Sequence, residues 1–167
     1  MLSTAAAATR VAARKAAATD DRTEIIMDWK LALVLIPVSD VDRAKEFYVE
    51  KMAFHLDVDH QPNDDFRIVQ VTPSGSACSI GFGIGINASE PGSTKGLHLC
   101  VADIEAARGE LTGRGVEISE PYHFGMQGRA DGIDPNRGDY ATFCNFDDPD
   151  GNTWVLQEVG HAAAESD

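Results

Sequence analysis

The sequence is short of the features that mark several classes of protein. It has only three cysteines, Cys78, Cys100 and Cys144, and no CxxC pair, which argues against a disulfide framework or a zinc site and fits reduced thiols in a cytoplasmic protein. No apolar run approaches the roughly 20 residues that span a bilayer. Basic residues are few, with 14 Lys and Arg against 27 Asp and Glu and a net charge of −13. Nucleic acid and anionic membranes repel such a polyanion, so neither is expected as a partner.

The length of 167 residues suits one domain, or two fused half-domains, with a buried core. Residues 1–26 differ from the rest because they are rich in alanine and contain no acidic residue before Asp20. We expect them to be a disordered tail or to precede a true start at Met27; a targeting role is the alternative. The polar residues 161–167 are expected to form a second tail.

One short pattern occurs twice in the chain. The segment VSDVDRAK at 38–45 corresponds to VADIEAAR at 101–108, and each copy follows an apolar run and leads into residues with helical spacing. A repeated strand–helix unit predicts two similar modules, at residues 27–88 and 96–160, that bury their sheets together. Ligands are expected in the space between such modules.

Each module is predicted to have the order β-α-β-β-β. In the first module the predicted elements are a strand at 31–38, a helix at 40–52 and strands at 54–60, 66–72 and 77–84. In the second they are a strand at 96–102, a helix at 103–113 and strands at 116–122, 140–146 and 152–159. Residues 85–95 are rich in turn formers and predict a connector. Residues 123–139 form a long connection that is typical of a lid or binding loop, or else of a disordered segment.

Three motifs, in this order, resemble the vicinal oxygen chelate superfamily, which includes glyoxalase I, bleomycin-resistance proteins and extradiol dioxygenases. They are VSDVDRAKEFY at 38–48, GLHLCVAD at 96–103 and FDDPDGNTW at 146–154. The resemblance implies an α+β fold in which two tandem βαβββ modules form curved mixed sheets around a shared cavity, with helices outside. It also implies a homodimer, because relatives commonly dimerise, although two fused modules can close a cavity alone.

Metal-using members of that superfamily hold a divalent ion with inward-facing His, Glu or Gln side chains. The resemblance places Leu33, Gly96 and Val155 at three of the four ligand positions, and Ser79 or Gly81 at the fourth. Leucine, glycine and valine have no side-chain group that binds a metal. We therefore expect no catalytic metal and no other cofactor.

Strand alternation puts Gly96, His98 and Cys100 on the cavity side of one strand, and Val155 and Gln157 on the cavity side of another. His98 is the catalytic candidate, as a general acid or base or as a hydrogen-bonding group for a ligand; a purely structural histidine is the alternative. Gln157 is predicted to orient a ligand or to be an ordinary polar residue at a strand end. Cys100 is predicted to be a small buried filler.

The 123–139 connection carries Arg129 and Arg137, which could close over an anionic group or could be held by acidic residues of the loop itself. Tyr122 and His123, where the loop begins, are secondary candidates. The complete predicted ligand-binding set is Leu33, Leu35, Ser79, Gly96, Cys100, Arg129, Arg137, Tyr140, Val155 and Gln157.

Three functions are compatible with these residues. The first is a glyoxalase-like protein that binds and sequesters an apolar or aromatic compound between its modules without a metal, as resistance proteins do, and its acidity would favour a cationic compound. The second is a metal-independent lyase or isomerase of secondary metabolism that uses His98. The third is a divalent-metal lyase or dioxygenase whose ligands lie at other positions than those aligned above.

Overall fold

Two mixed β-sheets carry the fold in the computed structural model, which describes residues 27–161. The first sheet has the strand order β1-β4-β3-β2, with β1 at Leu33–Leu35, β2 at His55–Asn63, β3 at Phe66–Thr72 and β4 at Ser79–Ile84. The second has the order β5-β9-β8-β6-β7, with β5 at Leu97–Val101, β6 at Tyr122–Gly125, β7 at Gly128–Asp131, β8 at Thr142–Asp147 and β9 at Thr153–Glu158. In each sheet the first strand of the module pairs in parallel with the last, β1 with β4 and β5 with β9. The predicted α+β class with two tandem modules is confirmed.

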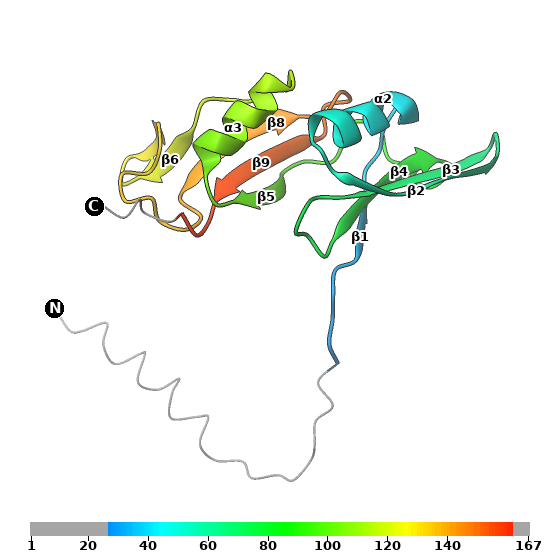
Figure 1. Ribbon diagram of the computed structural model, residues 1–167, viewed down its shortest axis with the longest axis horizontal. Helices are drawn as coiled ribbons and strands as arrows, with labels where there is room; N and C mark the ends of the chain where they lie inside the picture. Colours follow the sequence, from blue (N-terminus) through cyan, green and yellow to red (C-terminus); the bar gives the residue numbers. More distant parts are fainter. Residues whose placement is uncertain (1–26, 162–167) are drawn as a thin grey trace, which may run out of the picture. The chain divides into compact units, whose positions relative to one another are not determined.

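Each module places its helix against one face of its sheet (Figure 1). Helix α2 (Val41–Glu46) begins after Asp40, whose side chain accepts a hydrogen bond from the backbone N–H of Arg43. Helix α3 (Ile104–Gly113) begins in the same way after Asp103. The aspartate shared by the two copies of the repeated pattern therefore starts both helices. We call the sheet face that packs on a helix the helix face, and the opposite one the open face.

The first predicted helix, 40–52, is not one continuous α-helix. It changes at Phe47 into the π-helix η2 (Phe47–Lys51), and the backbone N–H of Met52 donates to the carbonyl of Phe47 at 2.9 Å. Phe47 and Tyr48, the first two residues of this π-helix, are both buried, at 6% and 0% exposure. Apolar spacing in the sequence predicts the buried stripe but does not distinguish the two kinds of turn.

One hydrophobic core joins the helix faces of the two sheets. The ring of Tyr48 lies 5.5 Å from that of Phe82 in the first module and 6.0 Å from that of Trp154 in the second. The Trp154 indole N–H donates to the Tyr48 hydroxyl at 3.1 Å, and this hydroxyl donates to Asp148 at 2.8 Å. Burial, and then the nearby Asp148 carboxylate, raise the pKa of Tyr48, so the phenol keeps its proton. These contacts tie the two modules together through their helix faces.

The connector between the modules runs close to the turn that precedes β9. At Gly92, which has a φ of +76°, an added Cβ would lie 2.0 Å from the carbonyl oxygen of Asp150. Asn152, in the same turn, donates from its side chain to the carbonyl of Pro37 at 2.9 Å. Glycine is therefore required where the connector passes this turn.

Two predictions about the second module are wrong. The strand predicted at 116–122 is reduced to an isolated bridge between Ile118 and Phe146. The connection predicted at 123–139 instead contains a β-hairpin, β6 and β7, which extends the edge of the second sheet. Its strands are only four residues long and are bounded by glycines, so the sequence signal for a turn outweighs that for a strand. Among residues 27–161 no helix has both the length and the apolar character needed to cross a bilayer.

Candidate functional site

The predicted site residues with the most varied side chains lie on the open face of the second sheet. Along β8 and β9 the residues that are buried alternate with residues that are half-buried. The half-buried ones share the open face with His98 and Cys100, because His98 pairs with Val155 and Cys100 pairs with Gln157 in the parallel ladder. The structure therefore brings together His98, Cys100, Val155 and Gln157 of the predicted set.

His98 and Gln157 are hydrogen-bonded to each other on this face. The imidazole Nδ1 lies 3.0 Å from Oε1 of Gln157, and the amide Nε2 of Gln157 donates to Sγ of Cys100 at 3.3 Å. Since an amide oxygen only accepts, the imidazole must donate from Nδ1. In the neutral ring Nε2 is then a hydrogen-bond acceptor that is available to a ligand.

Cys100 is not the buried filler that the sequence predicted. It is exposed, because it lies on the open face of the edge strand β5. All three cysteines are free thiols. Burial raises the pKa of the Cys144 thiol, on the helix face, to about 11, so that thiol stays protonated near neutral pH.

Three aromatic side chains form a cluster next to this polar group. The ring centroid of Phe143 lies 5.6 Å from that of Tyr122 and 5.8 Å from that of Phe124. Arg129 lies over the Tyr122 ring, with its guanidinium carbon 3.7 Å from the ring centroid. Phe124 is 65% exposed, so the cluster offers a free aromatic surface. This is a surface on which an aromatic ligand can stack.

The cluster and His98 are linked through β8. Phe143 pairs with Gln157, the partner of His98, and Asn145 pairs with Val155. The Tyr122 hydroxyl donates to Oδ1 of Asn145 at 3.0 Å. The open face of the second sheet thus combines stacking surface with an imidazole and two amides.

The open face of the first sheet has an apolar area formed by two leucines, with polar side chains beside it. An added Cβ on Gly81 would lie 2.9 Å from Cδ2 of Leu35 and 3.3 Å from Cδ1 of Leu33, so the two leucine side chains lie over this glycine. Ser79, 7% exposed, is hydrogen-bonded to Gln70 and Thr72 beside them. Leucine side chains here occupy the space that a ligating side chain at position 81 would fill.

The positions that the resemblance aligns with metal ligands do not carry a set of ligating side chains. Leu33, Gly81, Gly96 and Val155 have no donor atoms in their side chains. Gly96 has a φ of +71° and uses its backbone N–H on the hydroxyl of Thr153, at 2.7 Å. Within the part of the chain that the structure describes, no group of three or more His, Cys, Asp and Glu side chains is placed to hold an ion.

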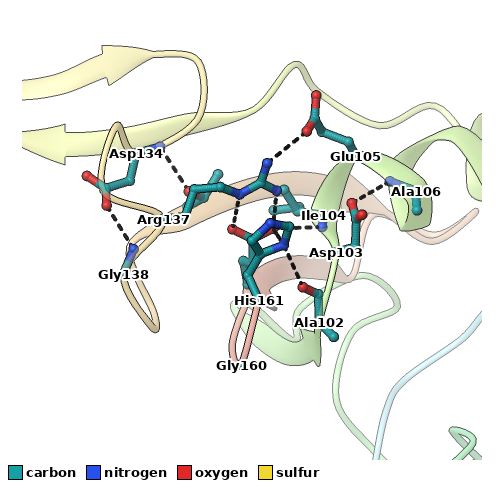
Figure 2. A network of polar contacts seen from close by, with 12 residues as sticks. Ala102, Asp103, Ile104, Glu105, Ala106, Asp134, Arg137, Gly138, Gly160 and His161 are labelled. Atoms are coloured by element: carbon teal, nitrogen blue, oxygen red, sulfur yellow. Dashed lines mark hydrogen bonds and ion pairs between the residues drawn. The ribbon is translucent and has the colours of Figure 1, made fainter. Parts of the chain in front are cut away.

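Arg137 and Tyr140 lie away from the His98–Gln157 pair and the aromatic cluster. Arg137 donates to Oε1 of Glu158 at 2.6 Å and to Glu105 of α3 at 3.0 Å (Figure 2). Glu158 belongs to the helix face of β9, opposite Gln157, so Arg137 is held by carboxylates of the second module. Tyr140, 58% exposed, precedes β8 with a φ of +60°, and its backbone N–H donates to the carbonyl of Glu158 at 2.8 Å.

A hollow of about 270 Å³ also lies between the two modules. Met52 and Phe54 line it from the first module, and Leu99, Cys100 and Leu156 from the second. Another hollow, of about 430 Å³, is bordered by Phe47, Lys51 and Asp148, and His98 is not among the residues that line it. Cys100, which lies on the open face, also lines the smaller hollow.

Sequence reasoning missed Phe124, Phe143 and Asn145 as members of the site and ranked Tyr122 low. The sequence gives little sign of these residues because it does not predict β6 as a strand. Without β6, whose Tyr122 pairs with Phe143, the side of the sheet to which Phe143 points is not determined. The spacing of Tyr122 and Phe124, two residues apart, was the available clue.

A sequence model of the family Glyoxalase/Bleomycin resistance protein/Dioxygenase superfamily matches residues 30–156. The structure of TnmS3 from Streptomyces sp. CB03234, described as an antibiotic binding protein, is 32% identical and superimposes with a TM-score of 0.62 over 80% of this chain and 98% of that chain. A glyoxalase/bleomycin resistance protein from the same Streptomyces strain is 34% identical, with a TM-score of 0.59 over 77% of this chain and 100% of that chain. The uncharacterized protein YetH of Bacillus subtilis (strain 168) is 26% identical over 132 residues, which are 77% of this chain and 98% of YetH.

Proposed function

The chain belongs to the Glyoxalase/Bleomycin resistance protein/Dioxygenase superfamily, and we propose that it binds and sequesters an aromatic small molecule without a metal ion. One observation carries the proposal, namely the aromatic cluster of Tyr122, Phe124 and Phe143 beside the His98–Gln157 pair. Leu33, at one of the aligned ligand positions, and Leu35 form an apolar area over Gly81 that also favours an apolar ligand. The antibiotic-binding relative supports a role in resistance or sequestration.

Thermal denaturation with a panel of polycyclic aromatic compounds tests this function. A ligand present at 100 times its Kd is expected to stabilise the protein by about 2.7 kcal/mol by mass action. The Phe124→Ser variant should bind the same compound about tenfold more weakly, because one aromatic contact is lost. Met126→Ser is the matched control: Met126 is fully exposed at the turn of the same hairpin, and its replacement should leave the affinity unchanged. Equal affinities for Phe124→Ser and the parent protein would contradict this site.

A metal-independent lyase or isomerase is the second candidate, because Nε2 of His98 is available as a proton acceptor. The two functions are distinguished by recovering the bound compound and measuring its mass and chromatographic retention. A sequestering protein returns the compound unchanged. A converted product that disappears in His98→Ala, with binding retained, would establish the enzyme instead.

We further propose that the protein is a homodimer whose open faces cover each other. Leu33, Leu35, Val58 and Phe66 are each 36–39% exposed on the open face of the first sheet. Exposed apolar groups gathered on one face mark an interaction surface. A second copy that set its second sheet against this face would give a ligand two walls, one apolar and one aromatic and polar.

Size-exclusion chromatography with light scattering is expected to give twice the chain mass of 17.9 kDa. Leu35→Glu should produce monomers, because a carboxylate would be buried without a partner. Ile84→Glu is the control: Ile84 is 40% exposed, close to the 39% of Leu35, but it pairs with Arg67 on the helix face. A parent protein that elutes as a monomer would refute the dimer.

A further inference from the structure

Four polar side chains form a continuous hydrogen-bonded series on the open face of the first sheet. Thr72 of β3 donates to Oδ2 of Asp57 in β2. The hydroxyls of Thr72 and of Ser79 in β4 are 2.6 Å apart, and Nε2 of Gln70 lies 3.2 Å from Oγ of Ser79. None of the functions considered above uses Gln70.

The direction of each hydrogen bond in this series follows from the charge on Asp57. The hydroxyl of Thr72, and then His55, hold the pKa of the Asp57 carboxyl below its usual value, so it is ionised and can only accept. The single hydroxyl hydrogen of Thr72 is used on Asp57. The hydrogen of Ser79 must therefore be given to Thr72, and Ser79 accepts from the amide of Gln70.

The series fixes the orientation of the Gln70 amide. If the amide were reversed, its oxygen would face the Ser79 oxygen with no hydrogen between them, and an unsatisfied contact of this kind is unfavourable. Nε2 therefore points to Ser79, and Oε1 makes no hydrogen bond with any residue in the range 27–161. Gln70 is half-buried and pairs with Gly81, so this free acceptor lies beside the apolar area formed by Leu33 and Leu35.

We propose that Gln70 is a specificity-determining residue whose Oε1 accepts a hydrogen bond from a hydroxyl group of an aromatic ligand. Asp57, Thr72 and Ser79 are positioning residues that hold the amide in this orientation. The site then prefers phenolic compounds to their ethers, which have no hydrogen to donate. Nε2 of His98, on the second sheet, is a hydrogen-bond acceptor like Oε1 of Gln70. This inference rests on the proposed binding of an aromatic compound and on the proposed dimer, in which the open face of the first sheet meets the aromatic cluster of the second copy.

The test compares 2-naphthol with 2-methoxynaphthalene, which share a ring system and differ in the donor. Titrations followed by NMR are expected to show that the parent protein binds 2-naphthol about 3- to 10-fold more tightly, the size of one hydrogen bond. In Thr72→Val the Ser79 hydrogen is released and can be given to Gln70 Oε1, so the preference should fall to about one or reverse. Thr72→Ser keeps the hydroxyl and should keep the preference.

A ligand-free measurement tests the orientation by itself. The Gln70 side-chain N–H proton that is donated to Ser79 should exchange slowly with solvent in the parent protein and in Thr72→Ser, and faster in Thr72→Val. Rapid exchange in the parent protein, or equal affinities for the two naphthalenes, would overturn the role of Gln70 while leaving aromatic binding intact. If neither naphthalene nor any compound of the aromatic panel bound, the proposed function would fail, and the inference with it.

Discussion

Replacing Asp148 with alanine is expected to lower the free energy of unfolding by about 3–5 kcal/mol, as when a buried, hydrogen-bonded charge is removed. Asp148 is 5% exposed and lies where the two modules meet. It accepts the Tyr48 hydroxyl at 2.8 Å and the Asn152 side-chain amide at 2.7 Å. The backbone N–H groups of Asp150 and Asn152 donate to its other oxygen, both at 2.9 Å. Alanine would leave these four donors without their acceptor.

Urea denaturation followed by circular dichroism measures this loss. Asp147→Ala is the matched control, since the neighbouring carboxylate is exposed and its removal should change stability by no more than about 0.5 kcal/mol. Asp148→Asn keeps one acceptor oxygen and should fall between the two. Equal stabilities for Asp147→Ala and Asp148→Ala would show that this junction does not hold the modules together.

Much of the fold could be predicted from the sequence, because the features that define it are local. The repeated strand–helix pattern predicts the two modules. Asp40 and Asp103 both cap helices, and the apolar residues Val41, Ala44 and Tyr48, which have helical spacing, are buried. These features are local in the sequence and have a definite period, so they are visible without the structure. The predictions for residues 1–26, and for all but the first residue of the tail at 161–167, lie outside the described residues.

The candidate site was less visible because its members meet only across strands. Alternation correctly put His98 and Gln157 on one side of their strands, but the register that pairs Cys100 with Gln157 depends on tertiary structure. The aromatic cluster depends on a hairpin that glycines concealed. The partners of Arg137 were sought among the aspartates of its own loop, whereas the structure places it on Glu158, more than twenty residues later. A long-range ion pair leaves no periodic signal.

Arg137→Met is expected to lower the free energy of unfolding by about 2–4 kcal/mol at neutral pH, because it leaves the carboxylate of Glu158 buried without its cation. The Glu158 side chain is 1% exposed and the Arg137 side chain 27% exposed. Two guanidinium nitrogens of Arg137 lie 2.6 and 3.2 Å from the carboxylate oxygens, and the backbone N–H of Ile104 donates to Oε1 at 3.1 Å. The arginine has a φ of +46°, and methionine would adopt it at a similar cost, so the comparison isolates the charge.

The pH dependence identifies the group responsible. Burial raises the pKa of Glu158, but the hydrogen bonds from Arg137 and Ile104 outweigh it and hold the pKa below its usual value. In the parent protein this carboxylate therefore adds stability above about pH 4.5, which is lost as the pH falls through the folded-state pKa. Without Arg137, burial dominates and the pKa rises, so the variant gains stability as the pH falls from 7 towards 4.5. The stability difference between the two proteins should thus shrink steadily between about pH 7 and pH 5.

Denaturation curves at several pH values across this range measure that difference. Arg129→Met is the control, because Arg129 contacts the Tyr122 ring and its loss should give a small change that does not depend on pH. A difference for Arg137→Met that stayed constant with pH would mean that Glu158 is not the titrating partner. The expected narrowing would instead show that the Glu158 carboxylate, on the face opposite His98, is the titrating partner of Arg137 and helps to hold the loop before β8 on the second sheet.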